Sequence, residues 1–145
     1  MGQRNMNSVK AIALAALVGG FWLVVAMDVS SNDGRLNIEE LAKELARLEN
    51  ANPPPKDPSV AGFRAYARGR NVIIEIIMPL RQDVTDAELA HWRAAASKEV
   101  IGKSCMKMGD SPAFANGLGY VYVYKNLAGT EVGRFPANVD TCRRR

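Results

Sequence analysis

The chain has 145 residues, of which 48% are apolar and 23% are charged. These values are typical of one small domain with a short additional segment. Five basic residues lie near the chain ends (Arg4, Lys10 and Arg143 to Arg145), so residues 28–142 carry 14 basic and 15 acidic side chains. This near-neutral body argues against a nucleic-acid-binding face despite the formal net charge of +4. With one His and two Cys, the chain has few residues that could bind a metal ion or act as a nucleophile.

Residues 11–27 form an uninterrupted run of apolar residues and glycine, AIALAALVGGFWLVVAM. As a helix this run would be ~25 Å long, slightly less than the ~30 Å hydrocarbon core of a bilayer. Arg4 and Lys10 precede it, whereas Asp28 and Asp33 follow it. The positive-inside rule therefore predicts a cytoplasmic N-terminus and an exported body.

We expect residues 1–27 to act as an uncleaved, single-pass signal anchor in the inner membrane, with the C-terminal domain in the periplasm. The alternative is a signal peptide cleaved before Met27, because Val24 and Ala26 are small enough for the −3 and −1 positions. Cleavage would secrete the body into the periplasm. No cysteine lies in or directly after the run, which argues against a lipoprotein.

Residues 28–57 are predicted to form a polar linker, an amphipathic helix and a proline-rich spacer. Asn37 and Glu40 have the spacing of a helix N-cap and its capping-box partner. An apolar stripe at helical spacing follows, comprising Ile38, Leu41, Leu45 and Leu48. We expect this stripe to pack on the domain's own sheet, with a coiled-coil stalk as the alternative.

Residues 58–145 are predicted to form an α+β domain with the element order β-β-α-β-β. Alternating side chains over 60–68 indicate a half-buried strand, and the turn Gly69 to Asn71 leads to a central strand over 72–78, VIIEIIM. Strands are again expected over 120–124 and 130–135. The predicted fold is an antiparallel sheet covered by one helix.

That covering helix is predicted over residues 84–104. Thr85 and Glu88 have the spacing of a capping box. The apolar face consists of Leu89, Trp92, Ala96 and Val100. Gly109 and Pro112 end the helix, and one further helical turn closed by Gly117 is expected after it.

Cys105 and Cys142 are the only cysteines, and an exported compartment is oxidising. We therefore expect a disulfide between them. A nucleophilic role for Cys105 with His91 as its base is disfavoured, because 14 residues of helix separate the two by ~21 Å. The pattern contains no metal-ligand spacing, and it implies no cofactor.

Glu75 is the one acidic residue in a predicted central strand. A buried carboxylate needs a cationic partner, and Arg64 or Arg68 on the preceding strand are candidates for a structural ion pair. Arg81 is a further candidate.

Three tyrosines alternate on the strand YVYVY: Tyr120, Tyr122 and Tyr124. Such a row is either a binding platform or a layer packed under a helix. With Leu89 and Trp92, these tyrosines are our candidates for partner contacts, in a mode that places a partner helix against the covering helix and an exposed sheet edge.

The C-terminal half carries FANGLGYVYVYKNLAGTEVGRF after a helix that ends near Cys105, and then VDTC. This arrangement, over about residues 58–142, resembles the small exported domains related to the beta class of type II secretion pilotins. The resemblance implies a pilotin-like fold and binding to a short helical part of a secretin subunit. Members of that class are lipoproteins, whereas this chain lacks the lipidation cysteine.

We therefore predict a membrane-anchored periplasmic protein-interaction module, an accessory part of a secretion or envelope assembly, with a protein partner in the cell envelope and no enzymatic activity. The alternative functions are a small periplasmic enzyme of cell-wall metabolism, with Glu75 or Glu88 as its acid, and an inhibitor of such an enzyme. The oligomeric state does not follow from the sequence.

Overall fold

The computed structural model describes residues 37–81 and 83–144. The elements in chain order are α3 (Ile38–Ala51), β1 (Gly62–Arg68), β2 (Asn71–Ile77), α4 (Asp86–Met108), α5 (Pro112–Ala115), β3 (Gly119–Lys125), β4 (Glu131–Ala137) and α6 (Val139–Arg143). Within the described ranges, no helix combines the length and apolarity needed to cross a membrane. The signal anchor predicted over residues 11–27 lies outside those ranges.

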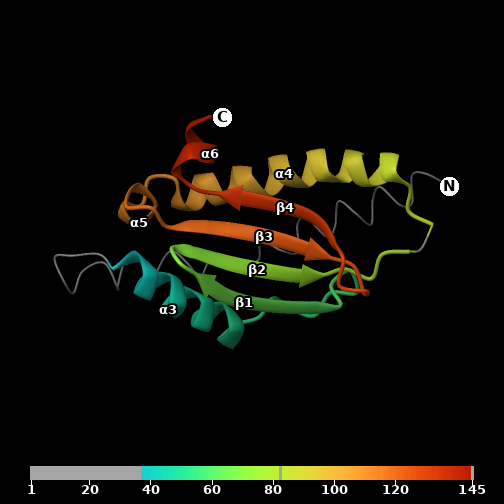
Figure 1. Cartoon of the computed structure of the whole chain (residues 1–145), viewed down its shortest axis with the longest axis horizontal. Helices are drawn as coiled ribbons and strands as arrows, with labels where there is room; N and C mark the ends of the chain where they lie inside the picture. The colour runs from blue at the N-terminus through green and yellow to red at the C-terminus, as the bar shows by residue number, and fades with distance from the viewer. Residues whose placement is uncertain (1–36, 82, 145) are drawn as a thin grey trace.

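The four strands form one sheet in the order β1-β2-β3-β4. The two predicted hairpins, β1–β2 and β3–β4, are both antiparallel, as expected. The central pair β2–β3 is parallel, so the prediction of a purely antiparallel sheet is wrong. The reason is the connection from β2 to β3, which contains α4. This helix runs along the sheet and returns the chain to the end at which β2 began (Figure 1).

Two helices pack on the sheet, the predicted covering helix α4 and the amphipathic helix α3. The stripe of α3 packs on β1 and β2, which confirms the expected packing of that helix on the domain's own sheet. α4 packs along β4. Both helices bury side chains in one core cluster with the same face of the sheet, and this cluster contains Leu41, Ala65, Trp92, Tyr122 and Phe135. We call it the helix-covered face.

The predicted capping signals fix where the helices begin and end. Asn37 accepts the Glu40 N–H at 3.2 Å, and Thr85 and Glu88 form the complete capping box of α4. The proline-rich segment follows the end of α3 at Ala51. α5 is the expected extra helical turn, and the left-handed φ of +102° at Gly117 lets the chain turn from it into β3.

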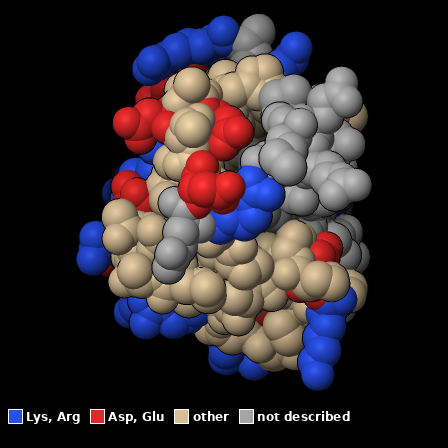
Figure 2. Space-filling model, turned by 90° about the vertical axis from the view of Figure 1, so that its right-hand side faces the viewer, with Lys and Arg blue, Asp and Glu red and all other residues tan. Residues whose placement is uncertain are grey.

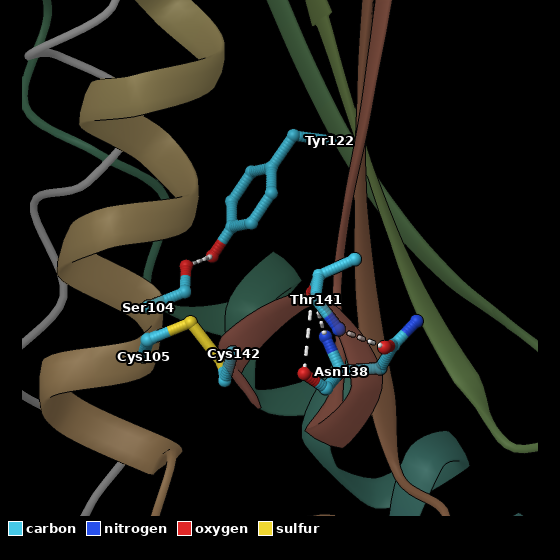
Figure 3. Close-up of a disulfide and its surroundings, with 6 residues drawn as sticks. All are labelled: Ser104, Cys105, Tyr122, Asn138, Thr141 and Cys142. Carbon is cyan, nitrogen blue, oxygen red and sulfur yellow. Dashed lines mark hydrogen bonds between the residues drawn. A yellow bond between two sulfur atoms is a disulfide. The ribbon is translucent and has the colours of Figure 1, made fainter. Parts of the chain in front are cut away.

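The short helix α6 was not among the predicted elements. Asn138 and Thr141 cap it reciprocally, each side chain bonded to the other residue's N–H at 2.9 Å (Figure 3). Cys142 lies within α6 and forms the predicted disulfide with Cys105 of α4. The bridge therefore ties the C-terminal helix to the side of α4.

Candidate functional site

The tyrosine row is part of the core. Tyr120, Tyr122 and Tyr124 lie fully buried on the helix-covered face, and Trp92 packs edge-on against Tyr124 with ring centroids 5.2 Å apart. Ser104 of α4 donates a hydrogen bond to the Tyr122 hydroxyl at 3.1 Å (Figure 3). In this arrangement the interpretation as an exposed platform is not supported, because the row packs in the core beside α4 and offers a partner no accessible area.

The other predicted contact residues are also mainly structural. Trp92 is buried between Tyr124 and Phe135, while Leu89 is half-buried and packs against the core. The sequence pattern identified these residues correctly as the inner face of α4. Their apolar character is explained by that burial without a partner.

The cysteine and histidine candidates for catalysis do not come together. Cys105 is oxidised in the bridge to Cys142 and is not a thiol nucleophile in this state. His91 is exposed on α4. Two open hollows border the disulfide, one beside Gly102 and Met106 of α4 and one beside Ser111 and Arg143.

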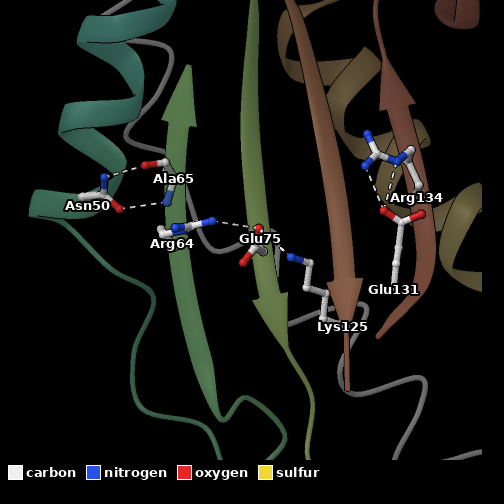
Figure 4. A network of polar contacts seen from close by, with 7 residues as sticks. All are labelled: Asn50, Arg64, Ala65, Glu75, Lys125, Glu131 and Arg134. Atoms are coloured by element: carbon white, nitrogen blue, oxygen red, sulfur yellow. Dashed lines mark hydrogen bonds and ion pairs between the residues drawn. The ribbon is translucent and has the colours of Figure 1, made fainter. Parts of the chain in front are cut away.

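Glu75 is buried on β2 and is held by two cations, as Figure 4 shows. Arg64 of β1 and Lys125 of β3 each place a nitrogen 3.2 Å from its Oε2. Of the two predicted partners, Arg64 is confirmed, whereas Arg68 lies four residues further along β1, opposite Asn71. Lys125 was missed, because only the parallel pairing of β2 with β3 brings it near Glu75.

The electrostatics of Glu75 are those of an ion-pair residue. Burial by itself raises the pKa of this carboxyl, but the hydrogen bonds from Lys125 and Arg64 outweigh burial and leave the pKa below its ordinary value. A general acid needs a raised pKa to hold its proton near neutral pH. The geometry therefore suits a structural carboxylate.

Glu49 of α3 has the opposite behaviour. Burial raises the pKa of its carboxyl to about 7, partly offset by the positive charge of Lys107 on α4. The pKa of the Tyr120 hydroxyl is also raised, first by its own burial and then by the charge of Glu49. The sequence pattern did not single out Glu49, because the residues with which it interacts, Lys107 of α4 and Tyr120 of β3, are distant in the sequence.

The second face of the sheet, which we call the charged face, carries Glu75 and its neighbours. Residues paired across adjacent strands share a face, and the registers give this face the side chains Arg64, Tyr66, Arg68, Ile73, Glu75, Ile77, Val121, Val123, Lys125, Glu131, Arg134 and Pro136. Ile73 and Val123 are only 4% and 2% exposed, yet they are not part of the core cluster. They form a small apolar floor of their own.

Both outer strands of the sheet are bonded by side chains at their free edges. On β1, the Asn50 amide donates to the Ala65 carbonyl at 2.7 Å and accepts the Ala65 N–H at 2.8 Å (Figure 4). On β4, Arg93 Nε donates to the Val132 carbonyl at 2.6 Å. The expected open edge for a partner is therefore occupied at both positions.

Charge is mixed over the surface. On the side of the molecule drawn in Figure 2, acidic and basic side chains alternate with uncharged surface and do not form one basic field. Among the described residues, no group of three or more His, Cys, Asp or Glu side chains is arranged to hold a metal ion. The most organised charges of the described residues lie on the charged face of the sheet, around Glu75.

The chain matches no protein-family model and no curated protein. Its fold is similar to the structure of the type II secretion system pilotin AspS from Vibrio cholerae, with a TM-score of 0.51 and 17% identity over 73% of this chain and 93% of that one. It is also similar to EpsS, a pilotin from the Vibrio vulnificus type 2 secretion system, with a TM-score of 0.51 and 16% identity over 72% and 91% of the two chains. The chain therefore has a pilotin-like fold.

Proposed function

We propose that this protein is a non-catalytic protein-interaction module of the cell envelope, an accessory component of secretion-system assembly. The observation that carries the proposal is the pilotin-like fold, which spans more than nine-tenths of both solved pilotin chains. The disulfide between Cys105 and Cys142 agrees with an oxidising compartment. The partner that we propose is a secretin subunit. We also propose that the chain is related to the beta-class pilotins, although it does not have their lipidation cysteine.

The proposal includes the location. Residues 11–27 and their flanking charges support an inner-membrane anchor with the folded domain in the periplasm, and cleavage before Met27 is the alternative. The intact mass of the protein extracted from membranes distinguishes the two. A full-length mass supports the anchor, whereas loss of residues 1–26 supports secretion.

An enzymatic role receives less support. Glu75 is neutralised by Arg64 and Lys125, and its pKa is lowered. Glu88, the other proposed acid, accepts the Thr85 N–H in the capping box of α4. Both carboxylates therefore already have structural roles, which favours binding over turnover.

The test is co-purification from the native envelope. Full-length tagged protein, crosslinked in cells and extracted with detergent, is expected to retain the secretin subunit of the same cell. An unrelated anchored periplasmic domain with the same tag is the control. The proposal is wrong if the secretin is recovered equally with both baits.

A further inference from the structure

We propose that one end of the folded domain lies against the surface of an anionic bilayer through four arginines, Arg68, Arg70, Arg143 and Arg144. This inference rests on the anchor in the proposed function, because it states how the anchored domain sits on its membrane. The observations that carry it are the lack of ion pairs at these arginines within the described ranges, their position at one end of the molecule, and the short stretch of chain between that end and the anchor.

Most other cations of the described residues are already paired with a carboxylate. The paired cations are Lys43, Arg47, Arg64, Arg81, Lys103, Lys125 and Arg134. Arg68, Arg70, Arg143 and Arg144 are exposed, and none of them forms an ion pair with another described residue. A guanidinium without a carboxylate keeps its charge and its five N–H donors for other acceptors, such as phosphate oxygens.

The four arginines come from two segments that border the same part of the structure. Arg68 ends β1, and Arg70 follows in the turn to β2, with its Nη1 3.1 Å from the position that a Cβ on Gly117 would take. Arg143 ends α6 and lines a hollow together with Ala115, the last residue of α5. Both pairs of arginines therefore border α5 and the turn after it.

This arginine end of the domain is also the end nearest to the proposed anchor. The start of α3 lies toward the same end of the molecule as the β1–β2 turn, α5 and α6 (Figure 1). Ten residues, 28–37, separate the apolar run from α3, and a chain of that length reaches at most ~36 Å. An anchor in the membrane therefore holds the arginine end close to the bilayer surface.

The opposite end of the molecule has acidic character. It contains the start of α4, where Asp83, Asp86 and Glu88 lie close together in the chain and Arg81 offsets one of the three charges. The 23 residues of α4 place this acidic end ~34 Å from the other end of the helix. An anionic surface attracts the arginine end and repels the acidic end, so its field favours one orientation of the domain.

Carboxylates at the arginine end limit the strength of this contact. Glu39, Glu40, Asp110 and Asp140 are exposed there, and Glu40 already pairs with Lys43. The domain without its tether would therefore bind a bilayer only weakly. A tether makes the contact intramolecular, so that a weak attraction is enough to set the orientation. The Debye length of ~8 Å at physiological salt restricts this attraction to groups close to the headgroups.

The experiment uses the full chain in lipid nanodiscs and measures the initial rate at which each arginine reacts with phenylglyoxal, read by peptide mass spectrometry. The discs contain phosphatidylcholine alone or phosphatidylcholine with phosphatidylglycerol. We expect Arg70 and Arg143 to react about fivefold more slowly in the anionic discs, the factor that one cation contributes near such a surface. In 1 M NaCl, where the Debye length is ~3 Å, the difference should disappear. Arg81, exposed at the acidic end, should react equally fast in both discs.

Variants locate the contact. In Arg70→Gln/Arg143→Gln, the two remaining arginines of this end are expected to lose most of their protection, because half of the cationic charge that holds the end to the bilayer is gone. The matched control is Arg47→Gln/Arg81→Gln, which removes the same charge from exposed positions of α3 and of the acidic end. It should leave the protection of Arg143 unchanged. Circular dichroism of each variant verifies the fold.

Four results would overturn the inference. The first is an equal rate at Arg143 in both kinds of disc, and the second is protection of Arg81 to the same extent. The third is unchanged protection of the remaining arginines in Arg70→Gln/Arg143→Gln. The fourth is the same protection in phosphatidylcholine discs after addition of inorganic phosphate, which would assign the arginines to a free anion.

The intact mass of the chain in the discs separates this inference from the proposed function. If residues 1–27 are retained and Arg143 is not protected, the inference fails while the anchor and the secretin partner stand. If cells yield only a chain that lacks residues 1–26, the anchor itself fails and the inference fails with it.

Discussion

Glu75 shows how a single charged residue is accommodated in the middle of a sheet. Its carboxylate is buried on β2, and cations from both neighbouring strands, Arg64 and Lys125, approach it at 3.2 Å. The long side chains of these cations keep their charged ends partly in water, so the desolvation penalty falls mainly on one group. Arg64 also lies over the Tyr66 ring, 4.9 Å from its centre, so one guanidinium contacts both the carboxylate and the ring.

Glu49 is expected to make stability depend on pH. The pKa of its carboxyl is about 7 in the folded protein, compared with ~4.3 for an unfolded chain. Between these values the folded state holds a proton that the unfolded state has lost, so the free energy of unfolding falls as the pH rises and levels off above pH 7.

Glu49→Gln removes this titration. From pH 5 to pH 8, we expect the wild-type free energy of unfolding to fall by about 2 kcal/mol more than that of Glu49→Gln, measured by urea denaturation. Glu40→Gln, at an exposed position of the same helix, is the control and is expected to follow the wild type. Parallel pH curves for Glu49→Gln and wild type would contradict the assignment.

At the level of elements, α3 both covers the sheet and closes its edge. Leu41 and Leu45 are buried in the core, while Asn50 in the last turn reaches the free backbone groups of Ala65 on β1. An unprotected edge strand is a template for pairing with another chain. Asn50 is therefore a polar residue of α3 with a structural role, because it bonds to the free edge of β1 while the apolar stripe packs in the core.

Asn50→Ala is expected to expose the β1 edge. Loss of both bonds to Ala65 should lower the free energy of unfolding by about 1–2 kcal/mol and promote self-association, measured by denaturation and by sedimentation velocity. The matched control is Asn52→Ala, because the Asn52 side chain is exposed and bonds to the Leu48 carbonyl of α3. Association of the two variants to the same extent would refute an edge-protecting role.

At the level of the whole molecule, the two hairpins are joined by α4 and the chain end is joined back to α4. α6 contains no buried residue, although Cys142 packs against the core, so the disulfide is the main attachment of the C-terminus. The bridge closes a loop that contains both β3 and β4. It therefore restricts the unfolded state of the whole C-terminal hairpin.

Removing the bridge tests its contribution. For a sequence separation of 37 residues, the loop-entropy relation gives about 3.8 kcal/mol, so Cys105→Ala/Cys142→Ala should lose stability of that order in denaturant unfolding. Dithiothreitol should lower the stability of the wild type to the same level and leave the double variant unchanged. A double variant as stable as the oxidised wild type would show that the bridge is dispensable.

The sequence by itself determined the local elements and the disulfide. Capping pairs such as Thr85 and Glu88, the alternation in β1, and the two cysteines are short-range or compositional signals, and each element that they predict is present. α6 was not predicted, because five residues are too few to show a helical period. The spacing of Asn138 and Thr141 is nevertheless that of a capping pair.

Only the tertiary structure decided how these elements meet. The parallel pairing of β2 with β3 depends on the path of α4, and it alone brings Lys125 to Glu75 and places Arg134 in the row of Arg64. It also assigned the tyrosine row to the core and placed Glu75 with its cations on the opposite face of the sheet. The sequence period predicts which residues of one strand share a face. It does not predict which other element packs against that face, because this depends on contacts between residues far apart in the sequence.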